Sequence, residues 1–186
     1  MGEEDAVESL KGQLLISAGG LYDPNFRHTV VLIGEHEAWG AVGVVLNRPL
    51  DVTVEEAVPT LTGLVESDEP LYQGGPVEPN QAVLMAEVAA PGLVDVPVFG
   101  SVGFLTGEVP EDVRTSVRRA RVFVGHSGWG PGQLEAELEA DAWITEEATV
   151  EDVFTPSPYA LWHDVLERKG PPYDQVARIP FDPSMN

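Results

Sequence analysis

The segments His28-Thr-Val-Val-Leu-Ile-Gly-Glu35 and Ala41-Val-Gly-Val-Val-Leu46 contain the longest apolar runs of the chain. Continuous apolar content over four to eight residues predicts strands that are buried on both faces. The intervening His36-Glu-Ala-Trp-Gly40 is typical of a turn, so the two segments are expected to form a hairpin with a five-residue connection. Both runs are far shorter than the roughly 20 residues that a membrane-spanning helix needs, so no membrane span is predicted.

Outside this hairpin the chain alternates between short strands and short helices. Further strands are expected at residues 13–18, 71–73, 83–88, 96–105, 121–125 and 143–145, and helices at 53–58, 110–119, 132–140 and 159–168. Thr53 and Glu56 fit a capping box at the start of the first helix. Ser157 and Pro158 suit the N-cap and first position of the last helix, and Gly170 suits its end.

This mixture predicts a single α+β domain over residues 1–186, with a core from about residue 12 to 168. Residues 1–9 and 171–186 are expected to be loose ends. A length of 186 residues, 43% apolar and 22% charged, is ordinary for one globular domain.

Several classes of protein are disfavoured by what the sequence lacks. The chain has no Cys, which excludes disulfides and thiolate metal sites. It starts without a basic segment followed by an apolar one, so no signal peptide is predicted and a cytoplasmic location is expected. No P-loop or dinucleotide fingerprint is present, and no cofactor is predicted.

The charge balance disfavours direct binding to nucleic acid. Ten Lys and Arg stand against 31 Asp and Glu, which gives a net charge of −21 that repels phosphate backbones. Arg114, Arg118, Arg119 and Arg121 nevertheless cluster, and they could form an anion or nucleic-acid patch. The alternative is that they end the helix expected at 110–119, where basic residues complement the helix dipole.

The stretch Val124-Gly-His-Ser-Gly-Trp-Gly-Pro-Gly-Gln-Leu134 has three interpretations. A strand, a glycine-rich turn and a helix start are the setting of a hydrolase nucleophile, here Ser127, although Trp129 stands where that turn needs a small residue. The turn could instead present backbone amides to an anion, with Trp129 beside the ligand. It could also serve packing alone, with Trp129 in the core. Gly74 and Gly75 could form a second amide nest or a plain turn.

Histidine spacing argues against a metal site. His28 and His36 would lie roughly 26 Å apart on one strand, so they cannot share an ion. Both are expected at solvated strand ends. No metal ligand set is predicted.

The helix expected at 132–140 has an apolar stripe made by Leu134 and Leu138. This pattern predicts that Glu135, Glu137 and Glu139 face mostly solvent.

Spaced motifs in a fixed order give the chain a resemblance to a known family. These motifs are Gly12-Gln-Leu-Leu-Ile-Ser17, Asp23-Pro-Asn-Phe-Arg-His-Thr-Val-Val31, Glu35-His36, Gly43-Val-Val-Leu-Asn-Arg-Pro49, Gly74-Gly-Pro-Val77, Gly128-Trp-Gly-Pro-Gly-Gln-Leu-Glu135, Trp143 and Phe154-Thr-Pro156. Over residues 12–168 the chain resembles the bacterial AlgH/YqgE family. The resemblance implies a mixed, mostly antiparallel sheet bent into a pseudo-barrel with flanking helices. It implies no catalytic residue, and it carries the label of candidate transcriptional regulator.

The loop motifs predict a ligand-binding site made of Asp23, Asn25, Asn47, Arg48, Gly74, Gly75, Trp129 and Gln133. Arg48 would neutralise an anion, Asn25 and Gln133 would orient it, and Gly74 and Gly75 would offer amides. The alternative is that these residues only satisfy turns. We therefore expect a non-enzymatic regulatory domain that binds a small anion or a protein partner without touching DNA, the alternative being a hydrolase that uses Ser127. The oligomeric state stays open.

Overall fold

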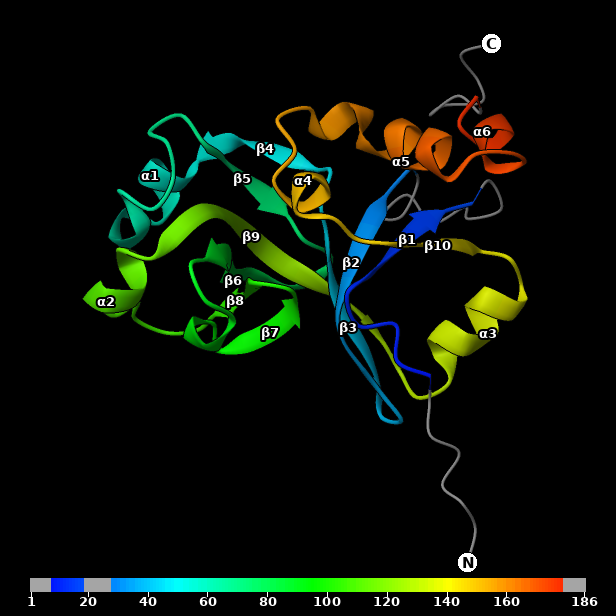
Figure 1. The fold of residues 1–186 in the computed structure, drawn as a ribbon, viewed down its shortest axis with the longest axis horizontal. Helices are drawn as coiled ribbons and strands as arrows, with labels where there is room; N and C mark the ends of the chain where they lie inside the picture. The colour runs from blue at the N-terminus through cyan, green and yellow to red at the C-terminus, as the bar shows by residue number, and fades with distance from the viewer. Residues whose placement is uncertain (1–7, 19–27, 179–186) are drawn as a thin grey trace, which may run out of the picture.

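The computed structural model describes residues 8–18 and 28–178. Asp23 and Asn25 of the predicted site lie outside the described residues. Within these ranges the chain forms an α+β domain built on ten strands that make one connected, mostly antiparallel sheet. The sheet bends, but it does not close (Figure 1). Two strands pair off its main path, and the other eight run from one edge to the other in the order β10 (Trp143–Glu147), β1 (Gln13–Ser17), β2 (Val30–Glu37), β3 (Gly40–Val45), β9 (Val117–Trp129), β6 (Val77–Val88), β8 (Val102–Leu105) and β7 (Val96–Phe99). The predicted fold class is confirmed.

One half of the sheet contains the predicted hairpin of residues 28–46. Its strands are β1 (Gln13–Ser17), β2 (Val30–Glu37), β3 (Gly40–Val45) and β10 (Trp143–Glu147). The predicted hairpin of β2 and β3 is confirmed, but its connection is only Ala38 and Trp39. The ladder is interrupted by a register shift between Ile33 and Glu35, and it then resumes and continues to the pair of Glu37 and Gly40.

The other half of the sheet surrounds one long strand, β9 (Val117–Trp129). Its remaining strands are β4 (Pro49–Thr53), β5 (Pro70–Gln73), β6 (Val77–Val88), β7 (Val96–Phe99) and β8 (Val102–Leu105). The single strand expected at 96–105 is a hairpin of β7 and β8. Gly100 turns the chain there with a φ of 51°, which favours glycine.

Strand β9 also corrects two predictions. The helix expected at 110–119 is only α2 (Glu111–Arg114), and Arg118 and Arg119 belong to β9. The strand expected at 121–125 is confirmed as the middle of β9. The glycine-rich turn expected after residue 125 is also strand as far as Trp129. The reason is pairing with distant segments: β9 lies against β6, β5 and β3, and these ladders override the local helix and turn signals.

The helices are short and lie on the outside of the sheet. They are α1 (Val54–Ala57), α3 (Gln133–Glu139), α4 (Val150–Val153), α5 (Leu161–Lys169) and α6 (Tyr173–Val176), with 3-10 turns at Pro59–Leu61, Pro91–Leu93 and Pro158–Ala160. As predicted, Thr53 caps α1 by accepting the Glu56 amide at 3.2 Å, and Gly170 ends α5. Ser157 makes no capping bond with its side chain. The prediction of a loose end from residue 171 is wrong for 173–176, because α6 packs on α5. No helix in the described part of the chain is both long and apolar enough to cross a bilayer.

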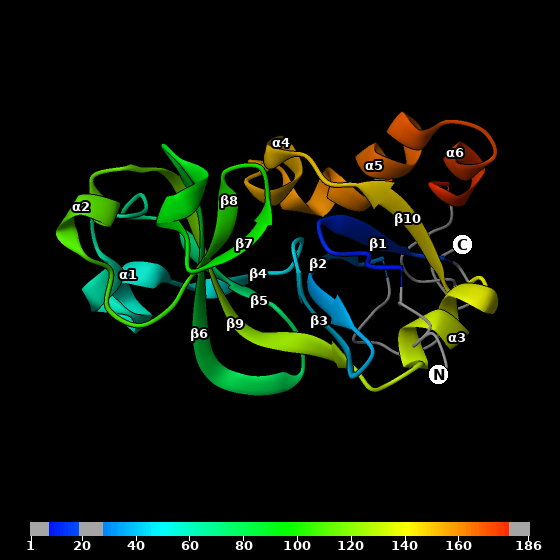
Figure 2. The ribbon, with the colours of Figure 1, turned by 60° about the horizontal axis from the view of Figure 1, so that its bottom comes forward.

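In the half of the sheet formed by β1, β2 and β3, alternate side chains point to opposite faces, and each face packs against a different helix. Leu14, Val30 and Leu32 share a core cluster with the α5 residues Trp162 and Val165, among others. The next residues along the strands, such as Leu15 and Val31, share a second cluster with Leu134 of α3. Figures 1 and 2 show α5 and α3 on opposite sides of β1 and β10. We call these sides the α5 face and the α3 face.

Candidate functional site

An open cleft of about 520 Å³ lies on the α5 face, where the chain passes from β3 to β4 beneath the start of α5. Its described lining is His28, Asn47, Arg48, Pro49, Tyr159, Trp162, His163 and Ala177. Two residues of the predicted site, Asn47 and Arg48, are therefore brought together with four ring-bearing side chains.

Asn47 builds the floor of this cleft. Its side-chain oxygen accepts the backbone N–H of Val30 at 3.1 Å, and its side-chain nitrogen donates to the carbonyl oxygen of His28 at 2.8 Å. Both bonds fix the start of β2, where His28 has a left-handed φ of 50°. Asn47 thus positions His28, and both the oxygen and the nitrogen of its carboxamide are hydrogen-bonded to the backbone.

A stacked pair of rings forms one wall. The His28 and Trp162 rings lie parallel within 8°, with centroids 3.8 Å apart. The indole N–H of Trp162 donates to the carbonyl oxygen of Ser17 at 3.0 Å, which ties α5 to the end of β1. The wall is therefore held from two sides.

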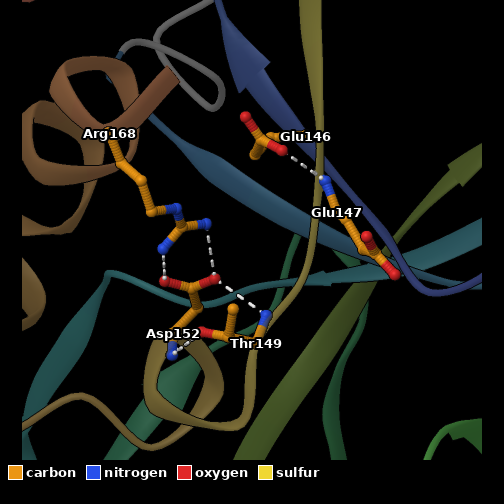
Figure 3. Close-up of polar contacts among 5 residues, drawn as sticks. All are labelled: Glu146, Glu147, Thr149, Asp152 and Arg168. Carbon is orange, nitrogen blue, oxygen red and sulfur yellow. Dashed lines mark hydrogen bonds and ion pairs between the residues drawn. The ribbon is translucent and has the colours of Figure 1, made fainter. Parts of the chain in front are cut away.

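An ion pair between exposed Arg168 and buried Asp152 fixes the far end of α5 (Figure 3). The Arg168 guanidinium donates to both Asp152 carboxylate oxygens, at 2.8 and 3.0 Å. Asp152 is 4% exposed and also accepts the backbone N–H of Thr149 in the capping box of α4. The hydrogen bonds to Asp152 raise the pKa of Arg168 above its ordinary value. This bidentate contact gives α5 a defined orientation over the cleft.

The charge of the cleft differs from that of the chain. Its described lining contains an arginine and two histidines but no Asp or Glu. Three other clefts of the described residues each have an acidic residue in their walls: Glu108 and Glu111, Glu66 and Glu69, and Asp141. In a chain with a net charge of −21, the absence of carboxylates from the described part of this wall suits it to an anion.

Trp129 and Gln133 do not reach this cleft. Trp129 is 5% exposed in the core cluster of the α3 face, edge-on to Trp143. The indole N–H groups of Trp129 and Trp143 donate to one Glu137 oxygen, at 3.2 and 3.0 Å. Gln133 donates to the other Glu137 oxygen and accepts the N–H of Gly130. The core interpretation of Trp129 thus holds on the α3 face, and the role predicted for Gln133 in orienting the ligand of Arg48 is wrong.

The glycines at 74 and 75 serve the crossing of β5 and β9. The N–H of Gly74 donates to the carbonyl oxygen of Val124, and its own oxygen accepts from Val45. A Cβ on Gly74 would overlap the Gly125 carbonyl oxygen, and one on Gly75 would overlap the backbone of His126. The prediction that Gly74 offers its amide to an anion is wrong, because the sheet already uses that amide.

Ser127 lies inside β9 and is fully buried. Its hydroxyl donates to the carbonyl oxygen of Gly74 at 3.1 Å. The predicted strand–turn–helix setting of a nucleophile is therefore wrong, since the strand continues through Trp129 and the hydroxyl faces the β5 backbone.

His36 is also placed differently from the prediction. It is 4% exposed rather than solvated, because it points to the core side of β2. Its Nδ1 accepts the Leu10 N–H at 3.0 Å, so its Nε2 carries a proton and donates to Glu135 at 2.6 Å. A backbone N–H bond, and then the bond from His36, lower the pKa of the Glu135 carboxyl. Two of the three glutamates expected to face solvent, Glu135 and Glu137, thus have specific partners.

The arginine cluster is largely committed to the protein itself. Arg121 is 6% exposed, pairs with Glu69 at 3.1 Å and lies 4.4 Å above the Tyr72 ring. Arg119 pairs with Glu87 at 3.2 Å. Arg114 donates to the carbonyl oxygens of Thr60 and Thr62. Arg118 is exposed on β9. The helix-dipole explanation applies to Arg114 alone, since the other three lie on a strand.

Sequence reasoning missed the four aromatic residues of the cleft: His28, Tyr159, Trp162 and His163. His28 was expected at a solvated strand end and was tested only as a metal ligand. Trp162 is both a core residue, being 5% exposed, and part of the cleft wall. The position of Tyr159 could have been used to predict it, since an aromatic residue directly after Pro158 and before the apolar residues of α5 lies at the start of a helix.

The fold and the cleft define a class of protein: a single α+β domain on an open, mostly antiparallel ten-stranded sheet, with one ring-lined cleft beside α5. A family model described as AlgH-like, DUF179, matches residues 14–174. The chain therefore belongs to the AlgH-like family.

Relatives of similar length support this membership. A UPF0301 protein of Streptomyces avermitilis is 40% identical over 187 residues, covering 97% of each chain. A UPF0301 protein of Chlorobaculum tepidum is 37% identical, covering 94% of this chain and 95% of its own.

Two solved structures share the fold. The crystal structure of a protein from Corynebacterium diphtheriae gives a TM-score of 0.83 at 29% identity, covering 90% of this chain and 91% of that chain. The solution structure of the AlgH protein from Pseudomonas aeruginosa gives 0.69 at 25% identity, covering 96% and 98%.

Proposed function

We propose that this protein is a cytoplasmic regulatory domain that binds a small anion in the cleft beside α5. The observation that carries the proposal is the lining itself, which holds Arg48, His28 and His163 without a described carboxylate. In this strongly acidic chain, such a wall selects for negative charge.

The overall charge of −21 does not prevent this binding. Salt screens exposed charges beyond roughly 10 Å at 0.1 M ionic strength, so distant carboxylates contribute little at the cleft. The carboxylates of Asp164 and Glu167 lie closer, at 3.7 and 3.4 Å from the His163 ring, so the proposal depends on the charge of Arg48 and not on that of His163. A guanidinium within hydrogen-bonding distance of an anion forms short, charge-assisted bonds. The local arginine therefore outweighs the distant field.

Regulation in this proposal passes through the ligand or a protein partner and not through contact with DNA. Three of the four clustered arginines already bind Glu69, Glu87 or backbone carbonyl groups. Arg118 is the fourth, and one arginine neutralises too few phosphates for DNA binding. We do not extend the proposal to hydrolysis, because Ser127 has its hydroxyl buried against Gly74.

Isothermal titration with inorganic phosphate and with acetate, at low and moderate salt, tests the proposal. Replacing Arg48→Gln removes the guanidinium and should weaken binding about tenfold or more. The matched control is Arg118→Gln, which makes the same change in charge on an exposed part of β9 and should leave the affinity within about twofold. Equal weakening by both variants, or no binding to the wild-type protein, would refute the cleft as an anion site.

A further inference from the structure

Tyr159 is the most exposed large apolar residue of the described chain. Its side chain is 83% accessible, although it lines the cleft. It lies in the turn Pro158–Ala160 that leads into α5, so the backbone beneath it is fixed by the proline and by the Ala160 N–H bond to Ser157. An exposed tyrosine alone is common on protein surfaces. Its position over a built cleft is the feature that needs an explanation.

The neighbouring wall is also aromatic and is already ordered. Trp162 and His28 are stacked in parallel, and the Trp162 indole is anchored to Ser17. Asn47 holds the backbone of His28 from below. These contacts hold the rings in place, so a flat molecule that enters the cleft meets a preformed surface and loses little free energy to ordering it.

The cleft is also larger than a simple ion requires. About 520 Å³ falls within the range of sites that hold organic ligands, which are typically lined by apolar and aromatic side chains with a few polar groups. Pro49 and Ala177 add apolar lining, while Arg48 supplies a permanent positive charge.

We infer that the anion bound in this cleft carries a planar ring, which packs against Tyr159 and the Trp162–His28 wall while its negative group faces Arg48. The inference rests on the proposed function and names the ligand class for the same site. Aromatic carboxylates and ring-bearing phosphates share this chemistry, a flat ring joined to an anionic group.

Matched pairs of probes separate the ring from the charge. Benzoate is compared with acetate, and phenyl phosphate with inorganic phosphate, by isothermal titration. Each pair keeps the anionic group and changes the ring, and the two pairs distinguish a carboxylate site from a phosphate site. We expect the ring-bearing member to bind about tenfold more tightly, because stacking and apolar burial add to the charge contact.

Variants of Tyr159 then assign the effect. Tyr159→Leu keeps an apolar side chain but removes the ring, and it should lower the affinity for the ring-bearing probe about fivefold without changing that of acetate or phosphate. Tyr159→Phe keeps the ring and should bind within about twofold of the wild type. Both variants are expected to fold, because this side chain is mostly exposed.

The outcomes separate the two proposals. If both members of each pair bind equally well and Arg48→Gln still weakens their binding, the ligand does not need a ring, but the anion site is supported. A ring preference that Tyr159→Leu does not reduce overturns the assignment of the ring to this wall. No binding of any of the four probes overturns the proposed function and this inference together.

Discussion

Two parts of the molecule carry the motifs that sequence analysis grouped into one site. The packed region, made by Gly74, Gly75, Trp129 and Gln133, lies around β9 and on the α3 face. The cleft, with Asn47 and Arg48, lies on the α5 face.

The two parts contain similar residue types, but in the packed region these residues stabilise the fold, whereas in the cleft some of them line a candidate binding site. In the packed region each indole, carboxamide and glycine has a partner within the protein, as the shared Glu137 carboxylate shows. In the cleft, Asn47 and Trp162 also have partners in the protein, but Tyr159 remains 83% exposed. Residue type therefore does not distinguish a binding residue from a structural one. The face of the sheet on which the side chain lies makes that distinction.

The largest effect is expected at the crossing of β5 and β9. Gly74→Ala should lower the free energy of unfolding by about 3 kcal/mol or more, because the new Cβ overlaps the Gly125 carbonyl oxygen and backbone must move. Urea denaturation measures the change. Gly92→Ala is the control, since a Cβ there meets no heavy atom within 4 Å. Similar stability of the two variants would mean that the crossing is looser than described.

A smaller loss is expected at Glu137. Glu137→Ala removes the acceptor shared by the Trp129 and Trp143 indoles and should destabilise the protein by about 2 kcal/mol. Glu139→Ala, on the exposed side of the same helix, should change stability by less than about 0.5 kcal/mol. A matching loss in both variants would attribute the effect to α3 in general and not to the shared acceptor.

The packed region should also respond to acid through Glu135. The folded-state pKa of this carboxyl lies below its ordinary value of 4.5, so its stabilising contribution is present above that pH and is lost as the pH falls through the folded value. Glu135→Gln should flatten the stability profile below pH 4.5. The effect should stay under about 1 kcal/mol, because the side chain is 41% exposed and solvent screens it. Acid titrations of unfolding by urea test this, and a slope unchanged from wild type would contradict it.

The smallest effect on stability is expected in the cleft. Tyr159→Leu should leave the free energy of unfolding within about 0.5 kcal/mol of wild type, because the ring covers little of the protein. The same denaturation assay applies. A loss above about 1 kcal/mol would place Tyr159 with the packed residues and remove the contrast between the two regions.

Local sequence patterns predicted much of the β1–β2–β3 half, because its strands are short apolar runs next to each other in the chain. The same reasoning found β9 only at residues 121–125 and failed on either side of them, as at Arg119, whose partner is Glu87 of β6. No local pattern encodes a ladder between segments more than 30 residues apart, so a helix signal at 110–119 was extended over residues that are strand.

For the candidate site, the sequence by itself singled out Asn47 and Arg48, because polar residues at the end of a buried strand are recognisable from order alone. It also determined the acidity of the chain and the motifs of the AlgH-like family. Which of these motifs meet depends on the tertiary fold. Adjacent strand residues point to opposite faces, and α5 returns from the far end of the chain to cover one of them, which places Trp162 beside His28 and leaves Trp129 on the other side.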